Sequence, residues 1–185
     1  MAPFGENDRL TFTPTPLAGA FVVELDRRED DRGFFARSFC QEEFAAHGLS
    51  PVVAQCNVSY NARRGTLRGM HYQAEPHAEA KLVRCTQGAI WDVIVDLRRG
   101  SPTFRRWYGV ELSADNRRAL YAPEGMAHGF QSLTDDAEVL YLMSRPYQAE
   151  AARGVRWDDP AFGIRWPIAE PHLSPRDRDF APFRE

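Results

Sequence analysis

The stretch AIWDVIVDL, residues 89–97, has an alternating pattern that indicates the fold class. Successive side chains of an extended chain point to opposite faces, so residues two positions apart share a face. One face then carries Trp91, Val93, Val95 and Leu97, and the other carries Ile90, Asp92, Ile94 and Asp96. This period of two, with its many Val and Ile residues, predicts a β-strand.

Similar short segments occur elsewhere in the chain, separated by glycine and proline. WYGVEL (107–112), RALYA (118–122) and EVLYLMS (138–144) are rich in residues that favour strands. Short strands spaced by turn residues predict an all-β sandwich or barrel, which we expect to form one domain over residues 1–185. QEEFAAHG (41–48) is the best helix candidate. We expect the Pro- and Arg-rich chain after Trp166 to lie over the domain as irregular structure.

Composition excludes several classes of function. The 185 residues include 23 basic and 26 acidic residues, and the net charge of −3 gives no general attraction to nucleic acid or to an anionic membrane. No apolar run approaches the ~20 residues of a membrane span, and the N-terminus lacks the pattern of a signal peptide. The three cysteines are widely spaced, which argues against a disulfide framework or a zinc site and predicts a cytoplasmic protein.

Two histidines and one lysine are candidates for a chemical site. Lys81 is the only lysine in a chain with 22 arginines. A lysine differs from an arginine as a compact ammonium whose pKa shifts readily. His71 in LRGMHYQ and His128 in PEGMAHGFQSL each lie beside a glycine at an expected strand end. Single histidines of this kind are more often structural, but two of them together suggest a site.

Metal binding is the first alternative for these histidines. PEGMAH resembles half of the metal site in cupin barrels. The other half needs His-x-His, and in HYQ the second position is Gln73. Zinc or iron normally takes three protein ligands, so we expect no metal and no cofactor.

Without a metal, the candidate residues suit proton transfer next to a ketone. Such a site needs a base, commonly histidine, and a cation or donor where the enolate oxygen develops charge. An epimerase also needs an acid on the opposite face, and Tyr141 can supply it. Arg32 in DDRGFF and Arg68 in TLRGMH each precede a glycine, where a guanidinium and nearby backbone N–H groups can hold phosphate.

The longer motifs resemble one known family. DRGFF, QCNVSYNARRGTLRGMHYQ, AKLVRCTQGAIWDVIVDLRRGSPTF, PEGMAHGFQSLTDDAEVLY and WDDPAFGIRWP are similar, in the same order, to the dTDP-4-dehydrorhamnose 3,5-epimerases. The resemblance runs from about Phe21 to Asp177. It implies a metal-free, cupin-type jelly-roll β-barrel with short flanking helices that forms homodimers. The implied substrate is a nucleotide-linked, dTDP-type 4-keto-6-deoxyhexose, epimerised at C3 and C5 on the route to dTDP-L-rhamnose.

The resemblance also implies roles for individual residues. His71 matches the general base and Asp177 the carboxylate paired with it. Lys81 matches the group that stabilises the enolate oxygen, Tyr141 the acid on the opposite face, and His128 a second active-site histidine. Among the positions that match substrate-binding residues, Arg32, Gln55, Asn57 and Arg68 match those that hold the nucleotide and its diphosphate, and Tyr147 matches a nearby pocket aromatic.

Several departures from the family pattern leave alternatives open. Arg37 stands where the family usually has a glutamate, and Glu79 replaces a commoner glutamine two residues before Lys81. If the family's glutamate helps to recognise thymine, Arg37 leaves the nucleobase undetermined. A 3- or 5-mono-epimerase or a 3,4-ketoisomerase acting on a related nucleotide sugar is one alternative. A non-catalytic barrel that binds sugar nucleotides is another.

Overall fold

The chain folds almost entirely into β-strands. A computed structural model describes residues 9–184. Its strands are β1 (Thr11–Pro14), β2 (Phe21–Glu24), β3 (Arg28–Asp30), β4 (Gly33–Phe35), β5 (Gln55–Asn61), β6 (Leu67–Gln73), β7 (Lys81–Gln87), β8 (Ala89–Asp96), β9 (Trp107–Ser113), β10 (Ala119–Ala122), β11 (Met126–Ser132), β12 (Ala137–Met143) and β13 (Ala152–Gly154). The helical segments are α1 (Gln41–Ala46), α2 (Pro175–Arg178) and one 3-10 turn (Ala149–Ala151). The all-β prediction is confirmed.

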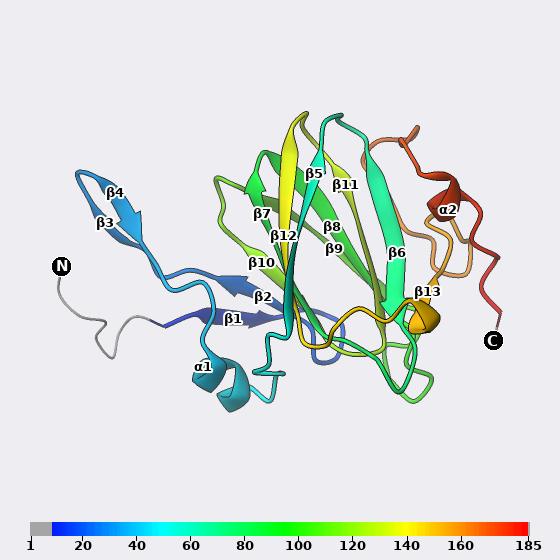
Figure 1. The fold of residues 1–185 in the computed structure, drawn as a ribbon, viewed down its shortest axis with the longest axis horizontal. Coiled ribbons are helices and arrows are strands. Elements are labelled where there is room, and N and C mark those ends of the chain that lie inside the picture. The colour runs from blue at the N-terminus through cyan, green and yellow to red at the C-terminus, as the bar shows by residue number, and fades with distance from the viewer. Residues whose placement is uncertain (1–8, 185) are drawn as a thin grey trace.

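Two antiparallel sheets face each other and form the barrel (Figure 1). The six-stranded sheet has the order β1-β2-β10-β7-β12-β5, and the five-stranded sheet has the order β13-β6-β11-β8-β9. Most neighbours in these sheets are far apart in sequence, so the barrel brings distant motifs onto shared walls. The main apolar core lies between the sheets and includes Ile90, Ile94, Leu120 and Phe130.

Strand β8 has the two faces that its alternation predicts. Ile90 and Ile94 belong to the core between the sheets. Val93 and Val95 belong to a second cluster on the outer side, which Val155 and Phe162 of the C-terminal chain help to cover. Both faces are therefore buried, which explains why apolar residues occupy all four positions on the outer face and two of the four on the inner face.

The other predicted elements are confirmed with small shifts of their ends, and the C-terminal chain differs in one respect. The segments at 107–112, 118–122, 138–144 and 41–48 correspond to β9, β10, β12 and α1. The chain after Trp166 was expected to be irregular, but it contains α2. Pro175 lies in the first turn of α2, and the Ser174 hydroxyl accepts a hydrogen bond from the Asp177 N–H. These are standard signals for the start of a helix.

The hairpin formed by β3 and β4 projects from the barrel rather than joining either sheet (Figure 1). Phe34 on this hairpin is 41% exposed. Within residues 9–184, no helix has the length and apolar character that a membrane crossing needs.

Candidate active site

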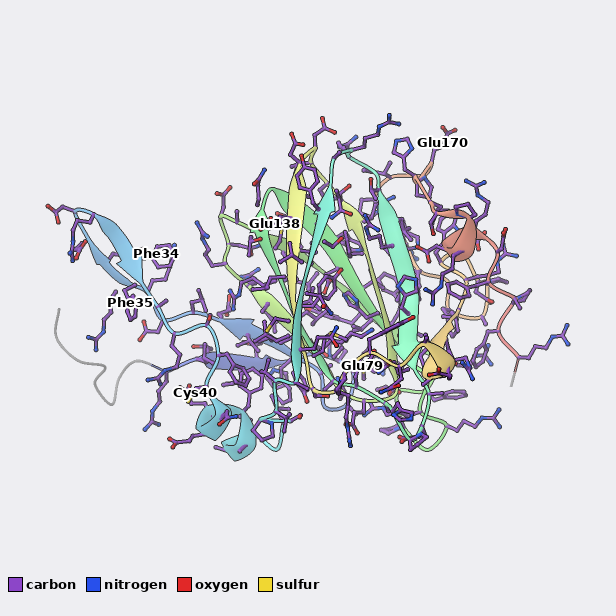
Figure 2. All side chains as sticks on the ribbon, viewed as in Figure 1. Phe34, Phe35, Cys40, Glu79, Glu138 and Glu170 are labelled. Atoms are coloured by element: carbon purple, nitrogen blue, oxygen red, sulfur yellow. The ribbon has the colours of Figure 1, made fainter. Side chains whose placement is uncertain are left out.

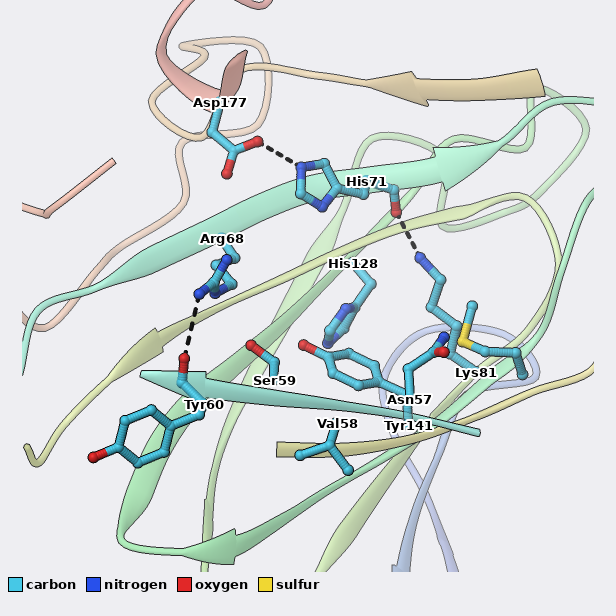
Figure 3. A pocket seen from close by; sticks show the side chains of 11 residues that line it. Asn57, Val58, Ser59, Tyr60, Arg68, His71, Lys81, His128, Tyr141 and Asp177 are labelled. Carbon is cyan, nitrogen blue, oxygen red and sulfur yellow. Dashed lines mark hydrogen bonds and ion pairs between the residues drawn. The ribbon is translucent and has the colours of Figure 1, made fainter. Parts of the chain in front are cut away.

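A pocket of about 480 Å³ opens between the two sheets (Figure 3). Seven of the residues predicted from sequence line it: Asn57, Arg68, His71, Lys81, His128, Tyr141 and Asp177. The remaining wall residues are Val58, Ser59, Tyr60 and Met143. The five-stranded sheet contributes His71 and His128, whereas the six-stranded sheet contributes Lys81 and Tyr141. The pocket therefore has imidazoles on one wall and an ammonium and a phenol on the other.

His71 is paired with a carboxylate at the mouth of the pocket. Its Nε2 lies 2.6 Å from Oδ1 of Asp177 on α2, an oxygen that accepts the imidazole N–H (Figure 3). Burial disfavours the charged form of Asp177, but the hydrogen bond and charge of His71 hold the pKa of this carboxyl below its usual value. When this carboxylate accepts the Nε2–H, the other ring nitrogen, Nδ1, is the one available to act as a base.

Lys81 crosses the inside of the barrel. Its Nζ donates a hydrogen bond to the backbone carbonyl of His71, 2.9 Å away, and forms an ion pair with Glu79 at 3.2 Å. Burial lowers the pKa of the Lys81 ammonium, while the negative charges of Glu79 and Asp92 oppose this shift. Lys81 thus reaches across from the opposite wall, and its ammonium is fixed beside the predicted base.

His128 has a carboxylate partner that sequence reasoning did not assign to the site. His128 is the cross-strand neighbour of His71, and its Nε2 lies 2.7 Å from Oδ1 of Asp92. Burial raises the pKa of Asp92, against the opposing charges of His128 and Lys81. The alternation of residues 89–97 had already assigned Asp92 to the face of Ile90 and Ile94, and a carboxylate on an apolar face was the available signal.

Tyr141 reaches the same space from β12. Its ring lies edge-on to the His128 ring, with centroids 5.9 Å apart and an angle of 85° between the planes. Burial raises the pKa of the Tyr141 phenol, and so does the negative charge of Asp92; the hydroxyl of Ser59 and the charge of Arg68 act in the opposite direction. The phenol therefore holds its proton at neutral pH and is able to donate it.

Of the five residues predicted to bind the substrate, four lie in or beside the pocket. Arg68 donates from Nε to the Asn61 side chain at 2.8 Å and remains exposed at the pocket wall. Asn57 lies on the opposite wall, and its Oδ1 accepts a hydrogen bond from the amide of Gln55. The other end of the Gln55 amide accepts the Tyr147 backbone N–H at 3.0 Å. Gln55 and Tyr147 thus extend the wall beyond the pocket lining.

The structure does not bring Arg32 to this pocket. Arg32 lies at the turn of the projecting β3–β4 hairpin, its side chain is 74% exposed, and it pairs with Asp30 of the same hairpin. A binding role for Arg32 cannot be fulfilled in the pocket of its own chain. The sequence motif contained no information on the direction in which this hairpin points.

Arg37, the main departure from the family pattern, is held within its own chain. Its guanidinium lies 2.5 Å from Glu43 Oε1 on α1, and the second oxygen of Glu43 accepts the Leu10 backbone N–H at 2.7 Å. Glu43 neutralises Arg37 locally. The unusual charge therefore has a structural partner outside the pocket lining.

Gln73, which replaces the second histidine of a cupin metal site, has its amide fully engaged. It donates to the His77 carbonyl at 3.0 Å and accepts the Gln148 N–H at 2.6 Å. Over residues 9–184, no group of three or more His, Cys, Asp or Glu side chains is placed to hold a metal ion. That the site works without a metal remains a prediction.

Comparison with known proteins identifies the family. The sequence profile described as dTDP-4-dehydrorhamnose 3,5-epimerase matches residues 14–185. The chain belongs to this family. The dTDP-4-dehydrorhamnose 3,5-epimerase of Pseudomonas aeruginosa is 48% identical over 177 residues, which cover 92% of this chain and 96% of that protein.

Solved structures agree on the fold. The crystal structure of the Bacillus anthracis epimerase with TDP and pyrophosphate bound superposes with a TM-score of 0.91, at 42% identity, covering 95% of this chain and all of that chain. A 3'-monoepimerase from Streptomyces bikiniensis in complex with dTDP-quinovose has a TM-score of 0.82 at 43% identity, covering 89% of this chain and 83% of that chain. These structures confirm the predicted cupin-type jelly roll.

Proposed function

We propose that this protein epimerises a dTDP-linked 4-keto-6-deoxyhexose at C3 and C5, converting dTDP-4-dehydro-6-deoxy-D-glucose into dTDP-4-dehydro-L-rhamnose. One observation carries the proposal beyond family membership. The predicted base and the predicted acid stand on opposite sheets of the barrel, with the pocket between them. Inversion of a carbon centre requires the proton to leave from one face and return to the other, and this geometry provides both groups.

The first half of the reaction is proton removal. Nδ1 of His71 takes a proton from the carbon next to the C4 ketone, and the electron pair of the C–H bond moves to form an enolate. Asp177, 2.6 Å behind the ring, stabilises the imidazolium that results. Lys81 supplies the positive charge for the enolate oxygen at C4, a contribution often worth about 3 kcal/mol.

The second half is return of a proton to the opposite face. The protonated phenol of Tyr141 donates to the carbanionic carbon while the ketone re-forms. Bulk water and the His71 imidazolium then restore the starting protonation states. The two transfers leave the composition of the sugar unchanged, so the reaction needs no oxidant, reductant or cofactor.

Tyr141→Phe tests the direction of proton return. Incubated in D2O with the dTDP-4-keto-6-deoxyhexose, the wild-type protein should introduce deuterium at C3 and C5 and form inverted product, both followed by NMR. Removing the phenol should lower inversion by about 10²-fold or more, while His71 still exchanges the carbon-bound proton. Tyr60→Phe is the matched control, since Tyr60 lines the same pocket but directs its hydroxyl to Asp136. Undiminished inversion by Tyr141→Phe would remove Tyr141 from the mechanism.

A 3-mono-epimerase is the second candidate, because one structural relative is described as a 3'-monoepimerase. The same D2O experiment separates the two: deuterium at C3 alone identifies a mono-epimerase. A non-catalytic sugar-nucleotide-binding barrel would exchange neither proton, and His71→Ala would then change nothing. A cytoplasmic location remains a prediction from the cysteine pattern.

We further propose that the protein functions as a homodimer in which Arg32 of one chain serves the pocket of the other. The hairpin carrying Arg32 projects away from its own barrel and presents Phe34 at its surface (Figure 2). An arginine that binds the diphosphate from this position must reach a second copy.

Complementation between two inactive variants tests this arrangement. Arg32→Glu keeps its own His71, and His71→Ala keeps its own Arg32, so each mixed dimer holds one complete pocket. Equal mixing makes about half of the dimers mixed, and each mixed dimer has one complete pocket of two. The mixture should therefore recover about a quarter of wild-type activity. Light scattering measures the oligomeric state. A monomer, or a mixture no more active than its components, contradicts the proposal.

A further inference from the structure

The side chain of Glu79 lies in the barrel beside Lys81, and the two proton transfers proposed above assign no role to this carboxylate. Figure 2 shows Glu79 in the lower part of the barrel, away from the projecting hairpin. Its side chain is only 4% exposed, and that of Lys81 7%. Two opposite charges are therefore withdrawn from water together, at a cost that their mutual attraction helps to offset.

The backbone between these two residues is fixed. Ala80 donates its N–H to the Ser144 hydroxyl at 2.7 Å and accepts the Ser144 N–H at 3.0 Å. Residues two apart in an extended chain share a face, so Glu79 and Lys81 both point to the same side of this anchored residue. Their 3.2 Å contact is thus set by the chain itself rather than by a flexible surface encounter.

The hydrogen bonds around the ammonium leave one direction unused. Lysine has three N–H donors. One meets Glu79 Oε1 and a second meets the His71 carbonyl. In the part of the chain that the structure describes, no third partner is found, and Lys81 lines the pocket. The two fixed contacts leave the third donor for a group in the pocket.

Glu79 also carries a desolvation cost that a neutral side chain of the same shape would lower. Its Oε2 is buried without a hydrogen-bond partner in the described structure. An unsatisfied buried oxygen is unfavourable, and it is more so on a charged carboxylate. A glutamine has nearly the same shape and would still accept from Lys81 through its amide oxygen. The additional contribution of glutamate is its negative charge.

The other charges near Lys81 do not replace this one. The charge of Asp92 on β8 also favours the ammonium, but Asp92 forms no ion pair with Lys81 in the described structure, and its Oδ1 accepts from His128. The remaining titratable groups that line the pocket are Tyr60, Arg68, His71, His128, Tyr141 and Asp177. Among residues 9–184, Glu79 is the one carboxylate within ion-pair distance of Lys81.

We propose that Glu79 is a positioning residue that holds Lys81 as an ammonium and directs its remaining N–H into the pocket. This inference deepens the proposed epimerase mechanism and rests on it, because the held charge is the one that stabilises the enolate. The residue acts through Lys81 and does not contact the reacting atoms. In a buried site, an ammonium without this partner would lose its proton at a lower pH.

Because Lys81 is the only lysine, the inference is directly measurable. Protein labelled with isotopic lysine gives one lysine side-chain NMR signal, and its titration reports the charge of Lys81 without any substrate. In Glu79→Gln, the signal should titrate about one pH unit or more below its wild-type position. The alkaline limb of kcat/KM should move in the same direction. Glu79→Asp, which keeps the charge, should recover most of both shifts.

Glu138→Gln is the matched control, since Glu138 lies on β12 and bonds Thr86 instead of Lys81. It should leave the lysine titration unchanged. Equal titration of Lys81 in wild type and Glu79→Gln, or a shifted titration with an unmoved kcat/KM profile, would overturn the inference. Failure of the proposed function is distinct, because the wild-type protein would then show no turnover while its lysine signal still titrates.

Discussion

Replacement of Asp177 by asparagine removes the charge behind His71 and leaves the shape of the side chain. The amide oxygen of the introduced asparagine is still able to accept the Nε2–H hydrogen bond that now spans 2.6 Å. What is lost is the negative charge that stabilises the imidazolium formed when His71 takes the substrate proton. That charge develops on His71 as the substrate proton is taken, so the substitution acts mainly on the transition state.

The size of the effect follows from the geometry of the pair. Two unit charges about 4 Å apart attract by roughly 4 kcal/mol at an effective dielectric constant of 20. The His71 side chain is 36% exposed, whereas Asp177 is 6% exposed, so solvent screens part of this attraction. A charge-assisted hydrogen bond contributes about 1.5–3 kcal/mol, which corresponds to a loss of about 10- to 150-fold in kcat.

Deuterium exchange from D2O into the keto sugar measures the step directly, because exchange reports proton abstraction without requiring inversion. Asp177→Asn should reduce the exchange rate by this factor and leave dTDP affinity, measured by calorimetry, close to wild type. Asp179→Asn is the matched control, since Asp179 is an exposed acid at the end of the same short helix. Exchange by Asp177→Asn within about threefold of wild type would refute the role of the carboxylate.

Two further predictions concern stability. Asp96 is buried, which disfavours its charge, but hydrogen bonds from Arg98, Ser101 and Thr103 lower its pKa from 3.8 to about 2. A carboxyl whose pKa is lower in the folded than in the unfolded state stabilises the protein at every pH above its unfolded pKa. Asp96→Asn should therefore lower the free energy of unfolding by about 2 kcal/mol at neutral pH, measured by urea unfolding. The difference from wild type should shrink as pH falls from about 4 to 2. Gly129→Ala should cost about 1–3 kcal/mol, because its Cβ would lie 2.8 Å from the Arg68 carbonyl oxygen and 2.9 Å from the Gly69 Cα, backbone atoms of the strand that carries His71. Gly100→Ala, with no heavy atom within 4 Å of its added Cβ, should be close to neutral; urea unfolding measures both glycine variants.

The strands and their faces were predictable because alternation is a local property. Residues 89–97 place every second side chain on the same face whatever the rest of the chain does. Ile90 and Ile94 accordingly lie in the inner core and Val93 and Val95 on the covered outer face. The C-terminal helix α2 was missed because its four residues are too few to show a helical period, although Ser174 and Pro175 carried its capping signal.

Sequence by itself determined the family, the strand pattern and the identity of seven side chains in the pocket, because motifs and side-chain periods are written along the chain. Only the tertiary structure decided which groups meet. His71 and Asp177 are 106 residues apart, and His128 and Asp92 are 36 apart. Such contacts depend on strand order, register and the path of the C-terminal chain, which no local pattern encodes. The same reason explains Arg32. Its motif predicted a binding residue, but the direction of the β3–β4 hairpin in the folded chain determines how far Arg32 lies from the pocket.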